Sequence, residues 1–110
     1  MAEPPEYDRY RRDVEVLGKI GAHLVSVVPY VECTIPKSLA SAAVAAWERD
    51  EEGPRAEETC EQVRSRLRAG DLALLGLEVS KSGRSSGDVV IVRLAAAQFA
   101  AAVDAWAESQ

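Results

Sequence analysis

The stretch GDLALLGLEVSKSG (Gly70–Gly83) decides the fold, because two different structures fit it. In the first, the preceding helix continues through Gly70 to about Ser80, and the leucines and alanine of the stretch favour that outcome. In the second, Gly70 ends the helix and Leu72–Ser80 is a strand that pairs with Val89–Leu94 across the loop KSGRSSGD. From the sequence alone, both structures remain open.

In the first structure, the long helix carries one apolar stripe with intervals of three and four residues. The stripe consists of Cys60, Val63, Leu67, Gly70, Leu74 and Leu77. The N-terminal helix, expected over about Glu6–Val27, carries a similar stripe of Tyr7, Tyr10, Val14, Leu17, Gly21, Leu24 and Val28. Apolar residues at this spacing share one side of a helix, so we expect both stripes to be buried. Gly70 would then mark a close helix crossing.

Two runs of β-branched residues predict strands. The first follows Pro29 and gives a strand over Tyr30–Ile35, and the second is DVVIVRL, which gives a strand over Asp88–Leu94. A lone strand is not stable, so each needs a partner, and the two are candidates to pair with each other. This pairing does not require Leu72–Ser80 to be a strand.

Capping residues and breakers place the remaining helices. Ser38 is the expected N-cap of a helix over Leu39–Asp50, which Gly53-Pro54 stops. Thr59 and Gln62 have the spacing of a capping box. A final helix is expected over Ala95–Glu108. The expected apolar sides are Leu39, Ala43, Val44 and Trp47 on the second helix, and Phe99, Ala102, Val103 and Trp106 on the last.

These elements predict an α+β, mainly α fold in a single domain over residues 1–110. About four helices would pack around a minimal antiparallel sheet of two or three strands. The alternative is a winged helix-turn-helix domain, because helix, strand, helix, helix, hairpin, helix is the element order of such domains with an added C-terminal helix. That alternative depends on the strand interpretation of Leu72–Ser80.

Composition favours a folded cytoplasmic protein. The chain has 110 residues, of which 47% are hydrophobic, with a formal net charge of −5. No apolar run approaches the length of a membrane span, and MAEPPEYDRYRRD lacks the apolar run of a signal peptide. We therefore expect Cys33 and Cys60 to be reduced thiols, most simply small core residues.

The sequence offers few reactive groups. His23 is the only histidine, and we expect a partly buried structural role for it beside the N-terminal stripe. No HExxH, CxxC, GxSxG, Walker or GxGxxG pattern occurs. The acidic residues occur in solvated runs, where their pKa values are only weakly tuned. The expectation is a protein without catalytic residues, cofactor or metal.

Apolar stripes without reactive chemistry favour a protein–protein interaction, adaptor or regulatory role. The candidate contacts are the acidic residues Glu48, Asp50, Glu51 and Glu52, together with Trp47 and Trp106. Acidic residues at a helix C-terminus oppose the helix dipole, which favours a basic protein partner there. Tryptophan is enriched at interface hot spots. A homodimer is the other expected assembly.

The alternative function is DNA-binding transcriptional regulation by the winged helix-turn-helix fold. Its candidate contacts are Arg64, Arg66, Arg68, Lys81 and Arg84. The first three would lie on the recognition helix, and the last two on the wing. The net charge of −5 disfavours nucleic acid, since phosphate contacts need a basic face. Glu57, Glu58 and Glu61 would also repel DNA at the end of the recognition helix.

Four segments give the chain a resemblance to small uncharacterised actinobacterial proteins. They are AAVAAWERD (42–50), ETCEQVR (58–64), LALLGLEVSKSGRSSGDVVIVRL (72–94) and AAAVDA (100–105). The resemblance implies no activity, cofactor or site residue. It favours the continuous helix through Gly70 and a bacterial cytoplasmic setting.

Overall fold

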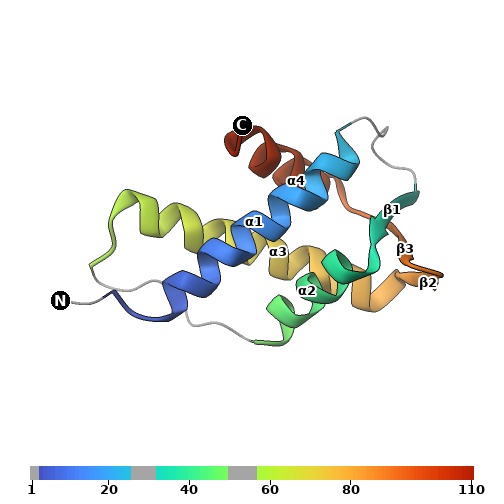
Figure 1. Ribbon diagram of the computed structural model, residues 1–110, viewed down its shortest axis with the longest axis horizontal. Coiled ribbons are helices and arrows are strands. Elements are labelled where there is room, and N and C mark those ends of the chain that lie inside the picture. The colour runs from blue at the N-terminus through green and yellow to red at the C-terminus, as the bar shows by residue number, and fades with distance from the viewer. Residues whose placement is uncertain (1–2, 26–31, 50–56) are drawn as a thin grey trace.

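A computed structural model describes residues 3–25, 32–49 and 57–110 of the chain. Four helices pack with a small antiparallel sheet in an α+β, mainly α fold, as the sequence predicts. The elements in chain order are α1 (Glu6–Leu24), β1 (Glu32–Pro36), α2 (Lys37–Glu48), α3 (Cys60–Ser82), β2 (Arg84–Ser86), β3 (Val89–Arg93) and α4 (Ala96–Glu108). The sheet lies at one end of the molecule and the N-terminal turn of α1 lies near the other (Figure 1).

Helix α3 is continuous through the ambiguous stretch, which confirms the first of the two sequence interpretations. It spans 23 residues, and Leu72–Ser80 is helical throughout, so the strand interpretation is wrong. Leu72, Leu75 and Val79 recur at helical spacing and are buried, which a strand with alternating faces would not allow. The capping box is also confirmed, because Thr59 accepts from the Gln62 amide and the Gln62 side chain accepts from the Thr59 amide.

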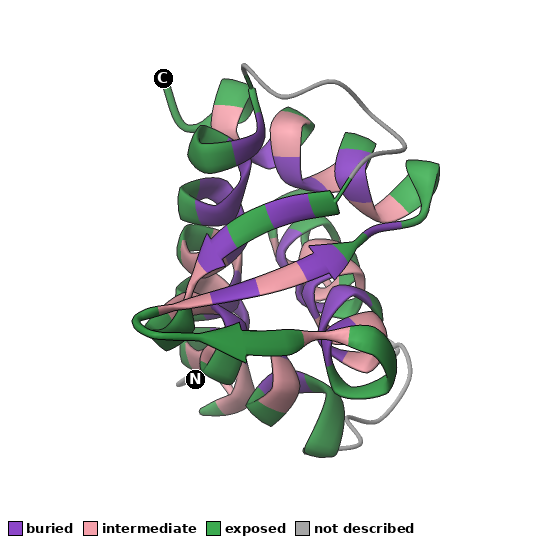
Figure 2. Ribbon diagram, turned by 90° about the vertical axis from the view of Figure 1, so that its right-hand side faces the viewer, coloured by how far each residue is buried: buried purple, intermediate pink, exposed green. Residues whose placement is uncertain are grey.

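The sheet has the strand order β1-β3-β2. Strand β3 pairs antiparallel with β1 in a register that places Cys33 opposite Val92, so the expected partnership of these two segments is confirmed. The hairpin partner of β3 is β2, and Gly87 supplies the positive φ that the tight turn between them needs. Strand β1 alternates exposed and buried residues, whereas β2 is exposed throughout (Figure 2).

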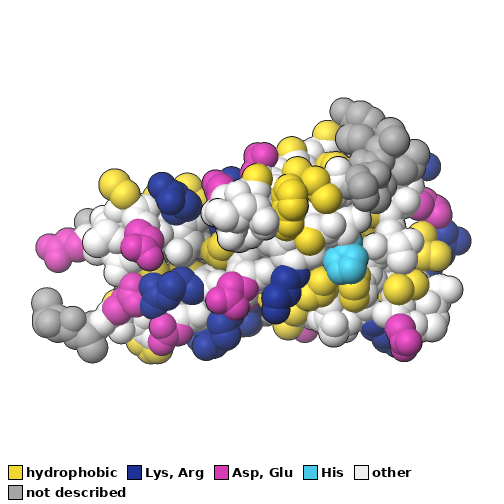
Figure 3. Space-filling model, turned by 45° about the horizontal axis from the view of Figure 1, so that its top comes forward, with side chains coloured by type: hydrophobic (Ala, Val, Ile, Leu, Met, Phe, Trp, Pro, Cys, Tyr) yellow, Lys and Arg dark blue, Asp and Glu magenta, His cyan; other side chains and the backbone are white. Residues whose placement is uncertain are grey.

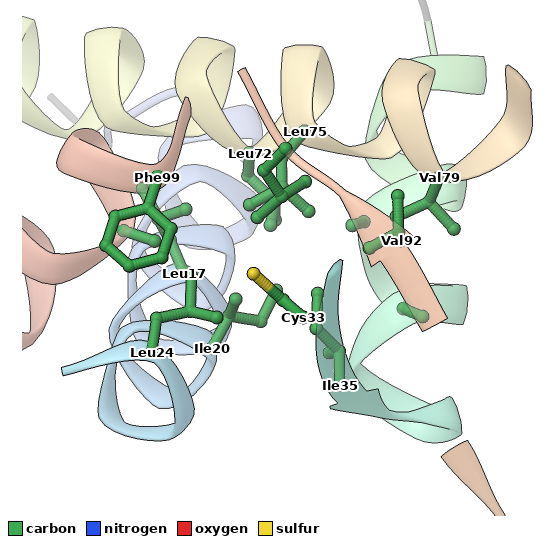
Figure 4. Packing of buried hydrophobic residues seen from close by; sticks show 14 of the residues in the cluster. Leu17, Ile20, Leu24, Cys33, Ile35, Leu72, Leu75, Val79, Val92 and Phe99 are labelled. Carbon is green, nitrogen blue, oxygen red and sulfur yellow. The ribbon is translucent and has the colours of Figure 1, made fainter. Parts of the chain in front are cut away.

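One core joins all four helices to the inner face of the sheet. Its largest fully buried aliphatic side chains are Leu17, Ile20, Leu24, Ile35, Leu72, Leu75 and Val92. Cys33 points from β1 toward the side chains of α1 and α3, so its expected core position is confirmed (Figure 4). Phe99 of α4 closes the same cluster. The expected stripe of α1 is also buried at Tyr7, Tyr10, Leu17, Gly21 and Leu24.

Two glycines allow helices to cross in direct backbone contact. A β-carbon on Gly21 of α1 would lie 1.9 Å from the carbonyl oxygen of Ala102 in α4. A β-carbon on Gly76 of α3 would lie 2.0 Å from the carbonyl oxygen of Ala43 in α2. Both distances are far inside van der Waals contact, so only glycine fits. The expected crossing at Gly70 is wrong, because nothing lies within 4 Å of a β-carbon built there.

Several local expectations need correction. Helix α2 begins at Lys37, directly after Pro36, so Ser38 is not its N-cap. The buried side of α2 consists of Ala40, Ala43 and Ala46, and that of α4 consists of Phe99, Ala102 and Ala105. Trp47 is exposed because small residues, which permit close approach, take the inward positions of α2. His23 is exposed rather than partly buried. Gly53-Pro54 and the start of the strand expected over Tyr30–Ile35 lie outside the described residues.

Two helices obtain hydrogen-bond acceptors for their first amides from distant segments. Neither α2 nor α4 has a side-chain N-cap of its own. The Lys37 amide donates to the Asp88 carbonyl at 2.8 Å, and the Ala95 amide donates to a Glu78 carboxylate oxygen at 2.8 Å. These bonds satisfy donors that every helix start leaves without an intrahelical partner.

Gly76, which lies at a helix crossing, and Gly70, which has open space beside it, form a matched pair for testing the packing. Gly76→Ala should lower the free energy of unfolding by about 1–3 kcal/mol, because the backbones of α2 and α3 must separate. Gly70→Ala should raise it by about 0.5–1 kcal/mol, because it removes backbone entropy from an exposed helical position. Urea unfolding in dilute solution measures both. Equal changes in the two variants would contradict the assigned crossing.

Candidate interaction surface

Helix α3 has two apolar sides, and each of them carries large aliphatic side chains. The side facing the core consists of Ser65, Ala69, Leu72, Leu75, Gly76 and Val79. The expected stripe of Cys60, Val63, Leu67, Gly70, Leu74 and Leu77, here called the outer stripe, lies on the opposite side of the helix. The expectation that this stripe is buried is therefore wrong. Cys60, Leu67, Gly70 and Leu74 are exposed, and Val63 and Leu77 are half-buried.

Backbone proximity explains this orientation. Helix α2 approaches α3 so closely at Gly76 that the inward positions there must be small. Ser65, Ala69 and Gly76 meet that requirement, whereas the residues of the outer stripe do not. Turning α3 by half a revolution would bring Leu67 and Leu74 against the backbones of α1 and α2. In the observed orientation Leu72, Leu75 and Val79 fill the core, and Leu67 and Leu74 lie outside.

Two leucines of the outer stripe and a neighbouring tryptophan are exposed. Leu67 is 57% exposed, Leu74 is 48% exposed, and Trp47 at the end of α2 is 40% exposed. These three residues line one groove of about 510 Å³ between α2 and α3. Alanines and Gly70 line the same groove. Contiguous exposed apolar residues of this kind mark interaction sites more often than isolated ones do.

Charged residues at the rim of the groove are held by ion pairs. Asp13 accepts two hydrogen bonds from Arg49, both at 2.7 Å, which tie α1 to the residue after α2. Arg66 donates to Glu58 at distances of 3.0–3.2 Å. Asp71 accepts from Arg68 at 3.2 Å. The groove therefore combines an apolar lining with a rim whose charges are already paired.

A buried polar cluster fixes the start of α3 against α1. The Glu58 side chain is only 4% exposed, and besides Arg66 it accepts a hydrogen bond of 2.5 Å from the Tyr7 hydroxyl. The ring of Tyr7 meets that of Tyr10 edge to face, with 5.4 Å between centroids. The hydrogen bond to the Glu58 carboxylate raises the pKa of Tyr7 to about 12. Glu58 thus acts as a structural acceptor and not as a DNA-repelling surface charge.

The acidic residues proposed to meet a basic partner are only partly described. Glu48 is exposed at the end of α2. Asp50, Glu51 and Glu52 lie outside the described residues. Of the two candidate tryptophans, Trp47 lines the groove and Trp106 is half-buried, with its β-carbon near Gly21.

Most of the candidate nucleic-acid contacts are engaged within the chain. Besides the Arg66 pair, Arg68 donates to both Glu108 oxygens at 3.1 Å, and Arg84 donates to Glu32 at 2.9 and 3.0 Å. Arg64 and Lys81 are exposed and make no ion pair with any described residue. Basic and acidic side chains are interspersed on the face in Figure 3, where His23 is also exposed.

The two thiols differ in environment. Cys33 is buried, and desolvation raises the pKa of its thiol, which lowers its reactivity. Cys60 is exposed at the first position of α3, so its expected core role is wrong. Within the described ranges, no group of three or more metal-ligating residues is placed to hold a metal ion. None of the described helices is long and apolar enough to span a membrane.

The sequence interpretation missed the groove because it assigned the outer stripe to the core. One signal was available. The stripe alternates intervals of three and four residues, the spacing of a coiled-coil seam, whereas the residues that face the core follow a less regular pattern. Tyr10 and Asp13 line the groove from α1, and Arg49 binds Asp13. These residues lie far from α3 in the chain, so no sequence pattern connects them with the outer stripe.

The raised pKa of Tyr7 predicts a specific pH dependence of stability. Its folded pKa of about 12 exceeds the usual 10.0, so the stabilisation is complete below pH 10 and is lost as the pH rises to about 12. Tyr7→Phe removes this titration. Between pH 10 and 12, the free energy of unfolding of the wild type should therefore fall more steeply than that of the variant. Parallel curves through this window would contradict the Tyr7–Glu58 hydrogen bond.

Comparison with known proteins adds no relative to these observations. No protein-family model matches the chain, and neither a curated protein nor a solved structure matches it.

Proposed function

We propose that this chain is a small non-enzymatic protein that acts by binding another polypeptide through the outer stripe of α3 and the adjoining groove. The observation that carries the proposal is the exposure of Leu67, Leu74 and Trp47 around one groove. Burying such residues against a partner removes apolar area from water at roughly 25 cal/mol per Å².

The shape and charge of the site support a protein partner. The groove is apolar along its lining, and its rim carries ion-paired carboxylates and arginines. An apolar centre with a polar rim is the usual anatomy of a protein interface. Trp47 offers a rigid aromatic anchor beside the groove, as hot-spot residues do. The setting we propose is the bacterial cytoplasm.

Nucleic acid is the weaker candidate. The formal net charge is −5, and Arg66, Arg68 and Arg84 are bound to carboxylates of the same chain. Phosphates would have to displace those carboxylates to contact these three arginines, which leaves Arg64 and Lys81 as the exposed basic candidates. The element order and the strand order β1-β3-β2 suit the winged-helix alternative, although the first strand of its hairpin is Arg84–Ser86 and the strand predicted over Leu72–Ser80 is helix. We therefore place protein binding first.

Site-specific photo-crosslinking tests the proposal in the native cell. A photoreactive residue in place of Leu74 should yield crosslinks to a polypeptide, because that side chain lies in the groove. The matched control places the same residue at Ala97, which is exposed on α4. No crosslink from position 74, or equal crosslinks from both positions, would refute the proposed surface.

A substitution in the outer stripe separates binding from folding. Leu67→Glu should abolish the crosslink from position 74, while changing the free energy of unfolding by less than about 0.5 kcal/mol, as is usual for exposed sites. Leu72→Ala serves as the core control and should cost about 2–5 kcal/mol. Thermal unfolding measures both. A Leu67→Glu variant as unstable as Leu72→Ala would mean that the stripe belongs to the core.

A further inference from the structure

We infer that the polypeptide bound by the outer stripe is a second copy of this chain, docked through its own α3 in antiparallel orientation. This inference rests on the proposed function and adds the identity, orientation and register of the partner. Three observations carry it: the spacing of the stripe, the size of its central residue, and the charges beside it.

The spacing of the outer stripe fits another helix of the same kind. From Cys60 to Leu77 the intervals alternate strictly between three and four residues, and this face of α3 has no partner among the described helices. Side chains with this repeat interlock with an identical repeat on a second helix. A straight contact over this length extends roughly 25 Å at 1.5 Å per residue.

The small residue in the middle of the stripe favours the antiparallel orientation. With the two-fold axis beside Gly70, Leu67 of each copy lies against Gly70 of the other, where a β-carbon would meet nothing within 4 Å. Val63 then faces Leu74 of the second copy, and Cys60 faces Leu77. Every layer is apolar, and Leu67, the more exposed of the two exposed leucines, fills the space that glycine leaves. A parallel pair would place Gly70 against Gly70 and leave a void.

Charges beside the stripe are complementary in the same register. Arg64 and Asp71 flank the stripe on one side, and in the antiparallel pair Arg64 of each copy lies opposite Asp71 of the other. Arg64 is exposed and makes no ion pair with a described residue. Asp71 accepts one bond from Arg68 and retains acceptor capacity toward a second cation. The two-fold axis produces this pair twice.

Trp47 of α2 also lies beside the stripe and widens the contact beyond the two α3 helices. It lines the groove with Leu67 and Leu74, so the α3 helix of a second copy would rest between Trp47 and the outer stripe. A contact of a single helix pair plus this flank is small by the standards of stable dimers. The expected assembly is accordingly a weak dimer that dissociates on dilution.

The native Cys60 supplies a register-specific test. In the antiparallel dimer the two Cys60 thiols lie at opposite ends of the interface, so a mild oxidant should not crosslink the wild type. Leu77→Cys should form a covalent dimer, because position 77 faces Cys60 of the second copy. The matched control, Leu77→Cys combined with Cys60→Ser, should stay uncrosslinked. Cys33 is buried and does not compete.

Charge reversal provides an independent readout at exposed positions. Arg64→Asp and Asp71→Arg should each weaken the dimer roughly tenfold by placing like charges opposite each other. The double variant should restore wild-type affinity. Multi-angle light scattering over a concentration series measures all of these, and circular dichroism confirms that each variant is folded.

Each outcome is decisive. A wild-type chain that remains monomeric at millimolar concentration overturns the inference, and so does a Cys60–Cys60 crosslink that forms as fast as the crosslink between Cys60 and the cysteine introduced by Leu77→Cys. Leu77→Cys remaining uncrosslinked while folded, or a double charge variant that stays as weak as the single ones, also overturns it. The proposed function fails separately, when position 74 crosslinks to no polypeptide in the cell. A crosslink to a different protein would preserve the proposed function and refute self-association.

Discussion

The structure depends on two places where helix backbones touch. At Gly21 and Gly76, the carbonyl oxygens of Ala102 and Ala43 occupy the space of a β-carbon. Such contacts bring α4 onto α1 and α2 onto α3 without large side chains between them. A chain with only one phenylalanine fills its core in this way, by shortening the distance between helices instead of enlarging the side chains. The buried alanines of α2 and α4 likewise allow the helices to approach closely.

Close packing on the inside determines what is left on the outside. Gly76 admits no side chain at the crossing, and in the resulting orientation of α3 Leu72 and Leu75 fill the core while Leu67 and Leu74 face outward. The ion pairs act in the same direction, since Glu58 and Asp13 hold Arg66 and Arg49 at the rim of the groove and keep its walls in place.

The sequence predicted the positions of helices and strands better than it predicted which side of each helix is buried. Strong local signals predicted the β-branched strand β3 and the Thr59 capping box, and both are observed, whereas the sequence left the continuity of α3 through Gly70 open. Periodicity identified the outer stripe but could not assign it to the inside, because α3 has a second apolar side opposite to it. The spacing of hydrophobic residues identifies an apolar helix face. It does not tell whether that face is buried within the same chain or against a second molecule.

The sequence also did not predict which residues far apart in the chain form hydrogen bonds and ion pairs with each other. The Tyr7–Glu58 and Arg49–Asp13 bonds join residues 51 and 36 positions apart in the chain. The arginines that suggested a nucleic-acid surface were counted as free charges, but carboxylates brought near them by folding neutralise most of them. Local sequence contains no record of such pairings, since neither partner has a spacing relation to the other.

The hydrogen bonds that distant segments accept from the first amides of α2 and α4 have a consequence for how the chain folds. Each helix start is complete only when a segment more than a dozen residues distant is already in position, Asp88 for α2 and Glu78 for α4. Isolated helices of 12 and 13 residues are marginal in water, so neither element persists alone. These two helices therefore form together with the segments that supply their acceptors, so their formation is coupled to that of the tertiary structure.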